Sequence, residues 1–179
     1  MTAMNRDELA RRIAETAVLR GTFTLRSGRT SSYYIDKYLF LTQPEILTEV
    51  GAMIATRLPP ETTRLAGAEL GGVPLVTAAS LASGLPSAYV RSSRKDYGTA
   101  KQLEGRLEAV DKVVLVEDVV TTGGQTIEAA KVIRDAGADI LGVIAIVDRQ
   151  EGARENVERA GLRFEALFTI SDLGLDPEI

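Results

Sequence analysis

The chain has 179 residues, a net charge of −4, 45% hydrophobic residues and 26% charged residues. Its length fits a single domain over residues 1–179, and its composition is ordinary for a soluble globular protein. The chain contains no cysteine and no histidine, which excludes disulfides, thiolate chemistry and imidazole as a base or metal ligand. The acidic balance argues against broad non-specific binding of nucleic acid.

The N-terminal part of the chain combines a helix with a hairpin. Asn5 and the acid three residues later resemble a capping box, so residues 6–19 should form a helix. Two short extended segments, at 23–25 and 31–36, should pair as a hairpin. Residues 1–40 do not follow the strand–helix alternation of the remaining chain, so we expect them to form a small hood over the carboxyl edge of a sheet.

The rest of the chain alternates between apolar runs and amphipathic segments. Pro44 suits the first turn of a helix with a buried face from Ile46 to Leu58. Strands are expected at 64–68, 87–91, 112–116, 139–147 and 163–168, and helices at 73–82, 127–134 and 153–160. Repeated strand–helix units predict an α/β fold, with a parallel sheet flanked by helices on both faces.

The stretch 113–126 organises this fold. Four apolar residues predict a buried parallel strand, and the carboxylates Glu117 and Asp118 follow at its end. A small polar turn then leads into a helix. Backbone N–H groups at a helix N-terminus bind phosphate, whereas carboxylates accept hydrogen bonds from hydroxyl groups. The pattern therefore indicates a ribose 5-phosphate site. The alternative is a buried strand, a capped turn and a helix without any ligand.

Four other segments could carry chemistry. The loop 92–109 is long, and residues 91–106 hold five basic residues against two acids, so the loop is either a lid that closes on a polyanion or a solvated surface loop. The turn 69–74 contains paired glycines, which fits either pyrophosphate binding by backbone amides or a plain tight turn. Arg26, Tyr34 and Arg149 could bind a planar anion. The alternatives are hairpin packing for the tyrosine pair and a solvated Arg149 beside a capping Asp148.

Four of these segments resemble the type I phosphoribosyltransferases. Residues 117–126 resemble the phosphoribosyl diphosphate motif of that family. Arg91, Lys95 and residues 96–98 match the flexible loop of the orotate phosphoribosyltransferases. Residues 23–36, paired with Asp148 and Arg149, resemble the segments that hold orotate in the same enzymes. The resemblance runs from residue 20 to the last strand and implies the type I phosphoribosyltransferase fold.

The resemblance also implies an activity and a set of site residues. The reaction would transfer ribose 5-phosphate from 5-phosphoribosyl 1-diphosphate to orotate, giving orotidine 5′-monophosphate and pyrophosphate in pyrimidine biosynthesis. The catalytic residues implied are Arg91, Lys95, Glu117 and Asp118. Phosphoribosyl diphosphate would contact Arg91, Lys95, Tyr97, Glu117, Asp118, Val119, Val120, Thr121, Thr122, Gly123, Gly124 and Gln125. Orotate would contact Arg26, Tyr34, Thr121 and Arg149.

The resemblance further implies magnesium as cofactor and a homodimer in which each lid loop closes over the partner's site. The metal would be carried by the diphosphate, with or without a water bridge to Asp118, and no protein residue would bind it directly. The longest apolar run, 140–147, is too short to span a membrane, and residues 1–12 lack a secretion signal. We therefore expect a cytoplasmic enzyme that binds neither nucleic acid nor membrane.

Two other functions stay open at this point. A phosphoribosyltransferase for another base would keep residues 117–126 but would need a different base pocket. A non-catalytic regulator on the same fold would sense a nucleotide and bind RNA. The acidic balance and the basic lid loop both argue against the regulator.

Overall fold

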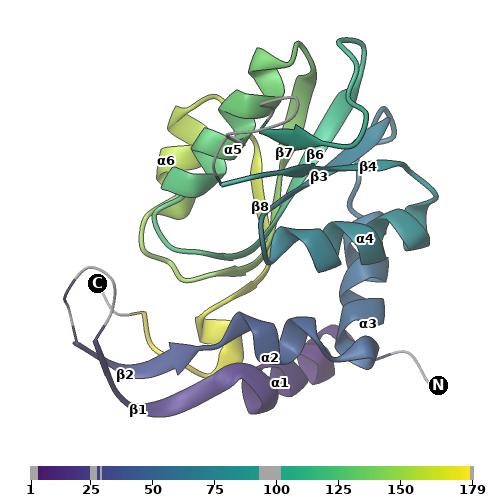
Figure 1. The fold of residues 1–179 in the computed structure, drawn as a ribbon. Coiled ribbons are helices and arrows are strands. Elements are labelled where there is room, and N and C mark those ends of the chain that lie inside the picture. Colours follow the sequence, from purple (N-terminus) through teal and green to yellow (C-terminus); the bar gives the residue numbers. More distant parts are fainter. Residues whose placement is uncertain (1–3, 25–27, 29, 93–101, 178–179) are drawn as a thin grey trace.

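A mixed six-stranded sheet forms the centre of the molecule (Figure 1). The structure is a computed structural model and describes residues 4–24, 28, 30–92 and 102–177. The sheet order is β5-β4-β3-β6-β7-β8, and every neighbouring pair except β4–β5 is parallel. The strands are β3 (Arg64–Ala68), β4 (Ser87–Val90), β5 (Leu103–Glu104), β6 (Lys112–Val120), β7 (Asp139–Asp148) and β8 (Phe164–Thr169). This arrangement confirms the predicted fold class and adds an antiparallel edge strand inside the loop 92–109.

Helices cover both faces of the sheet, as Figure 1 shows. They are α3 (Pro44–Ala55) and α4 (Gly72–Ser83) on one face, and α5 (Gly124–Asp135) and α6 (Ala153–Arg159) on the other. Alternate residues of β6 face opposite sides, so Val114 and Val116 join the core under α3 and α4, whereas Val113 and Leu115 join the core under α5 and α6. Burial on both faces explains why β6 reads as a continuous apolar run.

The described part of the hood, residues 4–24, 28 and 30–40, lies beside the carboxyl ends of the sheet strands (Figure 1). It contains α1 (Arg6–Ala17), the hairpin of β1 (Val18–Thr24) and β2 (Thr30–Ile35), and most of α2 (Lys37–Leu41). The Asn5 side chain accepts a hydrogen bond from the Glu8 backbone at 2.9 Å, so the predicted cap is present. The short 3₁₀ helix η1 (Ser171–Leu173) brings the C-terminal segment back against α1.

Three local predictions differ from the structure. Helix α1 ends at Ala17, two residues early, because Val18 pairs with Ile35 in the hairpin. Helix α2 was not predicted; Asp36 caps it by accepting from the Tyr38 backbone at 3.1 Å. Strand β6 extends to Val120 because its pairing with β7 continues that far. The two acids of β6 therefore lie within the strand rather than after it.

No helix among the residues that the structure describes is long and apolar enough to cross a membrane.

Candidate active site

The turn between β6 and α5 presents the N-terminal backbone N–H groups of α5, which suit an anion. It begins at Thr121 and ends at Gly123, which has φ +79°, a left-handed conformation that favours glycine. A Cβ on Gly123 would stand 2.8 Å from Val157 Cγ2, so α6 packs tightly behind the turn. Asn156 Nδ2 on α6 also donates to the Thr122 carbonyl oxygen at 2.9 Å. The N-terminal N–H groups of α5 are thus fixed at one end of β6 and free to bind a phosphate.

Glu117 is a buried acid with unused hydrogen-bonding capacity. Its side chain is 8% exposed, and its Oε1 atom has no hydrogen-bond partner among the described residues. Burial, with the negative charge of Asp118 adding to it, raises the pKa of Glu117 to about 7, although a hydrogen bond with Thr126 acts in the opposite direction. Near neutral pH this carboxyl can exchange its proton for hydrogen bonds from a ligand's hydroxyl groups.

Asp118 is buried too, but its charge is compensated. Its Oδ1 atom accepts from the Val119 backbone, and its Oδ2 atom lies 2.7 Å from Lys37 Nζ in α2. Burial lowers the pKa of Lys37, but the attraction of Asp118 outweighs it, so the net shift is upward. A Cβ on Gly71 would stand only 1.7 Å from Asp118 Oδ2, so the backbone between β3 and α4 lies directly against this carboxylate.

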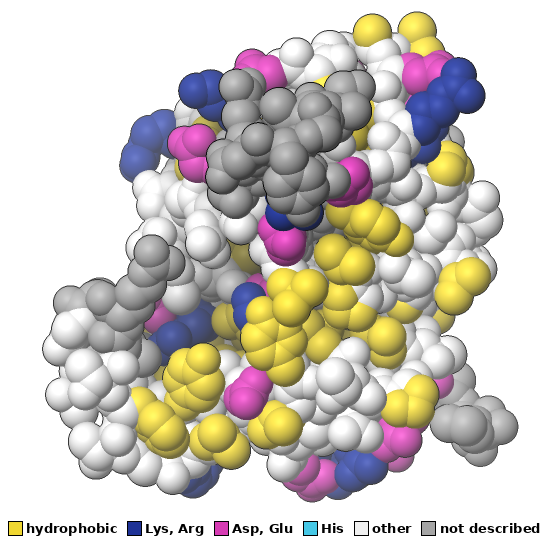
Figure 2. All heavy atoms as spheres, viewed as in Figure 1, with side chains coloured by type: hydrophobic (Ala, Val, Ile, Leu, Met, Phe, Trp, Pro, Cys, Tyr) yellow, Lys and Arg dark blue, Asp and Glu magenta, His cyan; other side chains and the backbone are white. Residues whose placement is uncertain are grey.

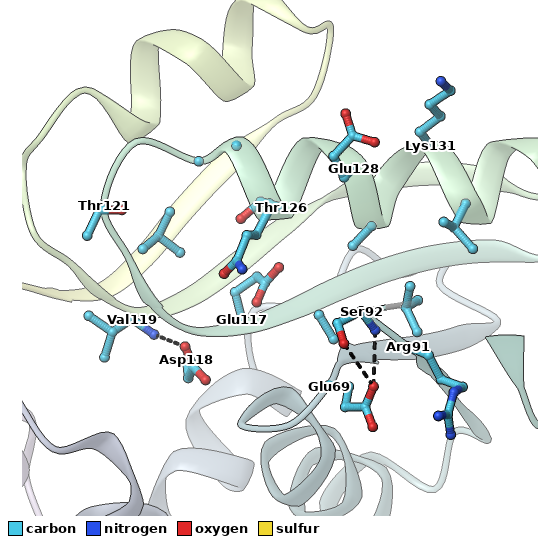
Figure 3. A pocket seen from close by; sticks show the side chains of 18 of the residues that line it. Glu69, Arg91, Ser92, Glu117, Asp118, Val119, Thr121, Thr126, Glu128 and Lys131 are labelled. Carbon is cyan, nitrogen blue, oxygen red and sulfur yellow. Dashed lines mark hydrogen bonds between the residues drawn. The ribbon is translucent and has the colours of Figure 1, made fainter. Parts of the chain in front are cut away.

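A cavity of about 770 Å³ joins these groups (Figure 3). Its wall includes Lys37 from the hood, Glu69 after β3, and Arg91 after β4. Glu69 Oε2 accepts from the backbone N–H of Ser92 at 3.1 Å, which anchors the first residue of the loop 92–109. In Figure 2 the surface is hollowed between the hood and the sheet, and basic and acidic side chains meet there.

The structure brings most of the predicted substrate residues to this cavity. Those that line it are Arg91, Glu117, Asp118, Val119, Val120, Thr121, Thr122, Gly123, Gly124 and Gln125. Arg26, Lys95 and Tyr97 lie outside the described residues, so their positions stay predictions.

Tyr34 and Arg149 do not line the cavity. Strand alternation in β2 buries Tyr33 and leaves Tyr34 45% exposed, where its ring lies 5.7 Å from that of Phe23. The predicted stacking of Tyr34 on a base is therefore not preformed in the structure. Of the pair, the buried ring is Tyr33.

Arg149 is buried rather than solvated. Its guanidinium carbon lies 5.4 Å from the Tyr33 ring centre, and its Nε lies 3.0 Å from Glu151 Oε1. The Arg149–Glu151 contact is an ion pair without a hydrogen bond, because the Nε–H bond of Arg149 does not point at the carboxylate oxygen. Nη2 of Arg149 is buried without a partner among the described residues. Nearby, the Arg149 backbone N–H donates to the Val120 carbonyl at 2.9 Å, which ties it to the end of β6.

Three residues of this region were not identified from the sequence as contributors: Lys37, Tyr33 and Glu151. The charged pattern of residues 151–159 is typical of a solvated helix face, but Glu151 pairs with Arg149 and its side chain is only 11% exposed. Strand alternation over residues 30–35 predicts that only one tyrosine of the pair points inward, and in the structure it is Tyr33. No local pattern would have indicated Lys37, because its partner lies 81 positions further along the chain.

Comparison with known proteins finds a matching family and similar enzymes. Residues 40–161 match the family model described as a phosphoribosyl transferase domain. An orotate phosphoribosyltransferase from Halobacterium salinarum is 47% identical over 165 residues, which cover 92% of this chain and 93% of that protein.

The fold of this chain is also similar to solved structures of orotate phosphoribosyltransferases. A Mycobacterium tuberculosis orotate phosphoribosyltransferase, in complex with Fe(III) dicitrate, superposes with a TM-score of 0.84 at 32% identity, covering 95% of this chain and 99% of that one. The same enzyme in complex with 5-phospho-α-D-ribosyl 1-diphosphate gives a TM-score of 0.78 at 32% identity and the same coverage.

Proposed function

This chain belongs to the phosphoribosyltransferase family, and from that premise we propose that it is an orotate phosphoribosyltransferase of pyrimidine biosynthesis. It transfers ribose 5-phosphate from 5-phosphoribosyl 1-diphosphate to orotate, which gives orotidine 5′-monophosphate and pyrophosphate. The observation that carries the proposal is the placement of Glu117 and Asp118 beside the N–H groups of the turn 121–125, at one wall of a single cavity. Acceptors for sugar hydroxyls and donors for a phosphate are what a ribose 5-phosphate requires.

The sugar phosphate is held by this wall. The backbone N–H groups at Thr121–Gln125 bind the 5-phosphate, and the dipole of α5 favours its negative charge. Glu117 and Asp118 accept hydrogen bonds from the ribose hydroxyls. As the bond between C1 of the ribose and the diphosphate breaks, the sugar gains positive charge, and the two carboxylates stabilise it because they lie in a site of low dielectric.

The leaving group is neutralised by cations. Arg91 lines the cavity, and we place Lys95 of the lid loop beside it when substrate is bound. Magnesium, when bound, neutralises part of the charge on the diphosphate. The substrate would carry this metal, with or without a water bridge to Asp118.

Orotate is oriented by the hood and by the end of β7. Arg149 offers a guanidinium that suits a carboxylate, and Arg26, Tyr34 and Thr121 complete the proposed base contacts. Tyr97 donates a hydrogen bond toward the leaving group. The base nitrogen attacks the sugar directly, so no protein nucleophile is needed. We further propose a cytoplasmic homodimer in which the lid loop of one subunit closes over the site of the other.

A spectrophotometric assay tests the function. Mixing the protein with orotate, 5-phosphoribosyl 1-diphosphate and magnesium should lower the near-ultraviolet absorbance of orotate. Asp118→Asn should abolish most of that change while the protein stays folded. A panel with uracil and purines separates the orotate enzyme from a transferase for another base. Failure to release pyrophosphate with any base, together with RNA binding, would favour the regulator instead.

A further inference from the structure

Lys37 is a basic residue of the hood that reaches the acid pair of the sheet. It is the first residue of α2, directly after the cap Asp36, and its Nζ lies 2.7 Å from Asp118 Oδ2. Its side chain is 33% exposed and lines the same cavity as the turn after β6. The hood therefore contributes a positive charge to the interior of the site.

The same oxygen of Asp118 also faces the turn between β3 and α4. A Cβ on Gly71 would lie 1.7 Å from Asp118 Oδ2, so the turn backbone and the ammonium of Lys37 meet at one carboxylate atom. The turn, residues 69–72, contains the acid Glu69 and no basic residue. A polyanion bound beside this turn needs a cation from another element, and Lys37 stands next to it.

The other described cations around the cavity do not contact the acid pair. Among the described residues, the basic residues that line it are Lys37, Arg91 and Lys131. Arg91 Nη1 lies 3.8 Å from Glu104 Oε1 on β5. Figure 3 shows Lys131 extending from α5 away from Glu117. Within this set, Lys37 is the basic residue in contact with the acid pair.

We propose that Lys37 binds the diphosphate of 5-phosphoribosyl 1-diphosphate, a role that rests on the function proposed above. In the absence of substrate its ammonium neutralises Asp118. An ammonium group has three N–H donors on a flexible stem, so it can keep one contact with Asp118 and direct another to a phosphate oxygen. Lys37 then links the ribose-binding acid to the leaving group and supplies the charge that the turn 69–72 lacks.

A double-mutant cycle separates this role from simple neutralisation of Asp118. Inorganic pyrophosphate is the probe, and its affinity with magnesium is measured by calorimetry for the wild type, Lys37→Met, Asp118→Asn and the double variant. We expect Lys37→Met to weaken pyrophosphate binding about tenfold or more in both backgrounds, since a charge-assisted hydrogen bond is lost. Lys37→Arg should restore most of the affinity.

Lys112→Met is the matched control, because Lys112 lies at the opposite end of β6 and should leave pyrophosphate binding unchanged. If Lys37 only neutralises Asp118, Lys37→Met will have no effect in the Asp118→Asn background, and this result would overturn the inference. The inference would also be overturned if the wild type is active and Lys37→Met binds pyrophosphate as tightly as the wild type does. That result would leave the proposed function intact. A wild type that neither binds pyrophosphate nor consumes orotate would contradict the proposed function itself.

Discussion

The guanidinium of Arg149 lies over the ring of Tyr33, with 5.4 Å between the guanidinium carbon and the ring centre. This contact joins the end of β7 to the hood hairpin. Tyr33 is itself fixed, because its hydroxyl donates to the Asp176 carbonyl oxygen at 3.1 Å in the C-terminal segment. Glu151 approaches the guanidinium at 3.0 Å. Arg149 is thus held in one orientation, which would reduce the entropy lost in the carboxylate binding proposed for it.

Removal of the Tyr33 ring should therefore weaken orotate binding. Tyr33→Leu removes a cation–π contact worth about 0.5–2 kcal/mol, so KM for orotate should rise roughly two- to thirtyfold. KM for 5-phosphoribosyl 1-diphosphate should stay near the wild-type value. Tyr33→Phe is the control, because it keeps the ring and loses only the hydroxyl. Steady-state kinetics with each substrate varied in turn will measure the two KM values. An equal rise in both would contradict a role of Tyr33 in positioning the base.

The raised pKa of Glu117 predicts a pH dependence of substrate binding. In the proposed role, ionised Glu117 would accept hydrogen bonds from ribose hydroxyls, and its protonated form would accept them less well. Since burial raises its pKa to about 7, kcat/KM for 5-phosphoribosyl 1-diphosphate should rise as pH increases through about 7. Glu117→Gln has no proton to lose and should lack this rise. Any step near pH 6 from the substrate phosphate will persist in the variant and serves as an internal control.

The raised pKa of Glu117 should also make the stability of the folded protein depend on pH. The folded protein holds the Glu117 proton up to about pH 7, whereas the unfolded chain releases it near the ordinary value of 4.5. The unfolded state thus binds fewer protons in this window, so the contribution of Glu117 to the free energy of unfolding falls as pH rises from 4.5 to 7. The fall should be on the order of 3 kcal/mol. Urea denaturation of the wild type and Glu117→Gln across this window would measure it, and parallel curves would contradict it.

Gly71→Ala should damage the site through Asp118. The added Cβ would stand 1.7 Å from Asp118 Oδ2, so the carboxylate or the turn must move. We expect kcat/KM to fall by about a hundredfold or more, because the acid leaves its place beside the ribose. Thermal denaturation should show a cost that largely disappears when Gly71→Ala is combined with Asp118→Ala, since only the 3.2 Å approach to the Cβ of residue 118 then remains. A stability cost that persists in the double variant would assign the effect to the backbone instead.

Asp172 should stabilise the contact between the two ends of the chain. Its Oδ2 lies 2.8 Å from Arg6 Nη2 and also accepts from the Thr169 backbone at 2.7 Å. Asp172→Asn should lower the free energy of unfolding at pH 7 by about 1–2 kcal/mol, a range that allows for the solvent exposure of Arg6. Asp7→Asn is the matched control. The Asp7 side chain is 95% exposed, and its Oδ1 lies 3.9 Å from Arg6 Nη1, a much longer contact than that of Asp172. Urea denaturation at pH 7 measures both, and equal losses would contradict this role.

The hydrogen bond from Arg6 lowers the pKa of Asp172 to about 2 from the ordinary 3.8. Its stabilisation is therefore complete above about pH 4 and is lost as pH falls through 2. Asp172→Asn should lack this acid-dependent component. The difference in free energy of unfolding between wild type and variant should shrink on acidification, and a constant difference would rule the mechanism out.

Much of the fold was determined by sequence patterns that are local. Apolar runs predicted β3, β6 and β7, because strands buried on both faces need no polar residues. The order of strand, acids, turn and helix at 113–126 also predicted that Glu117, Asp118 and the turn 121–125 lie together at one site. Its groups lie close together in sequence, and the carboxyl end of a parallel strand leads directly into its helix.

The tertiary structure decided what depends on contacts between distant segments. The ion pair of Lys37 with Asp118, and the burial of Arg149 between Tyr33 and Glu151, require the hood to lie against the carboxyl end of the sheet. The pKa of Glu117 likewise follows from burial and from the neighbouring charge of Asp118. No periodicity in the sequence encodes such proximity, because it is set by how the layers pack against each other rather than by the order of residues within one element.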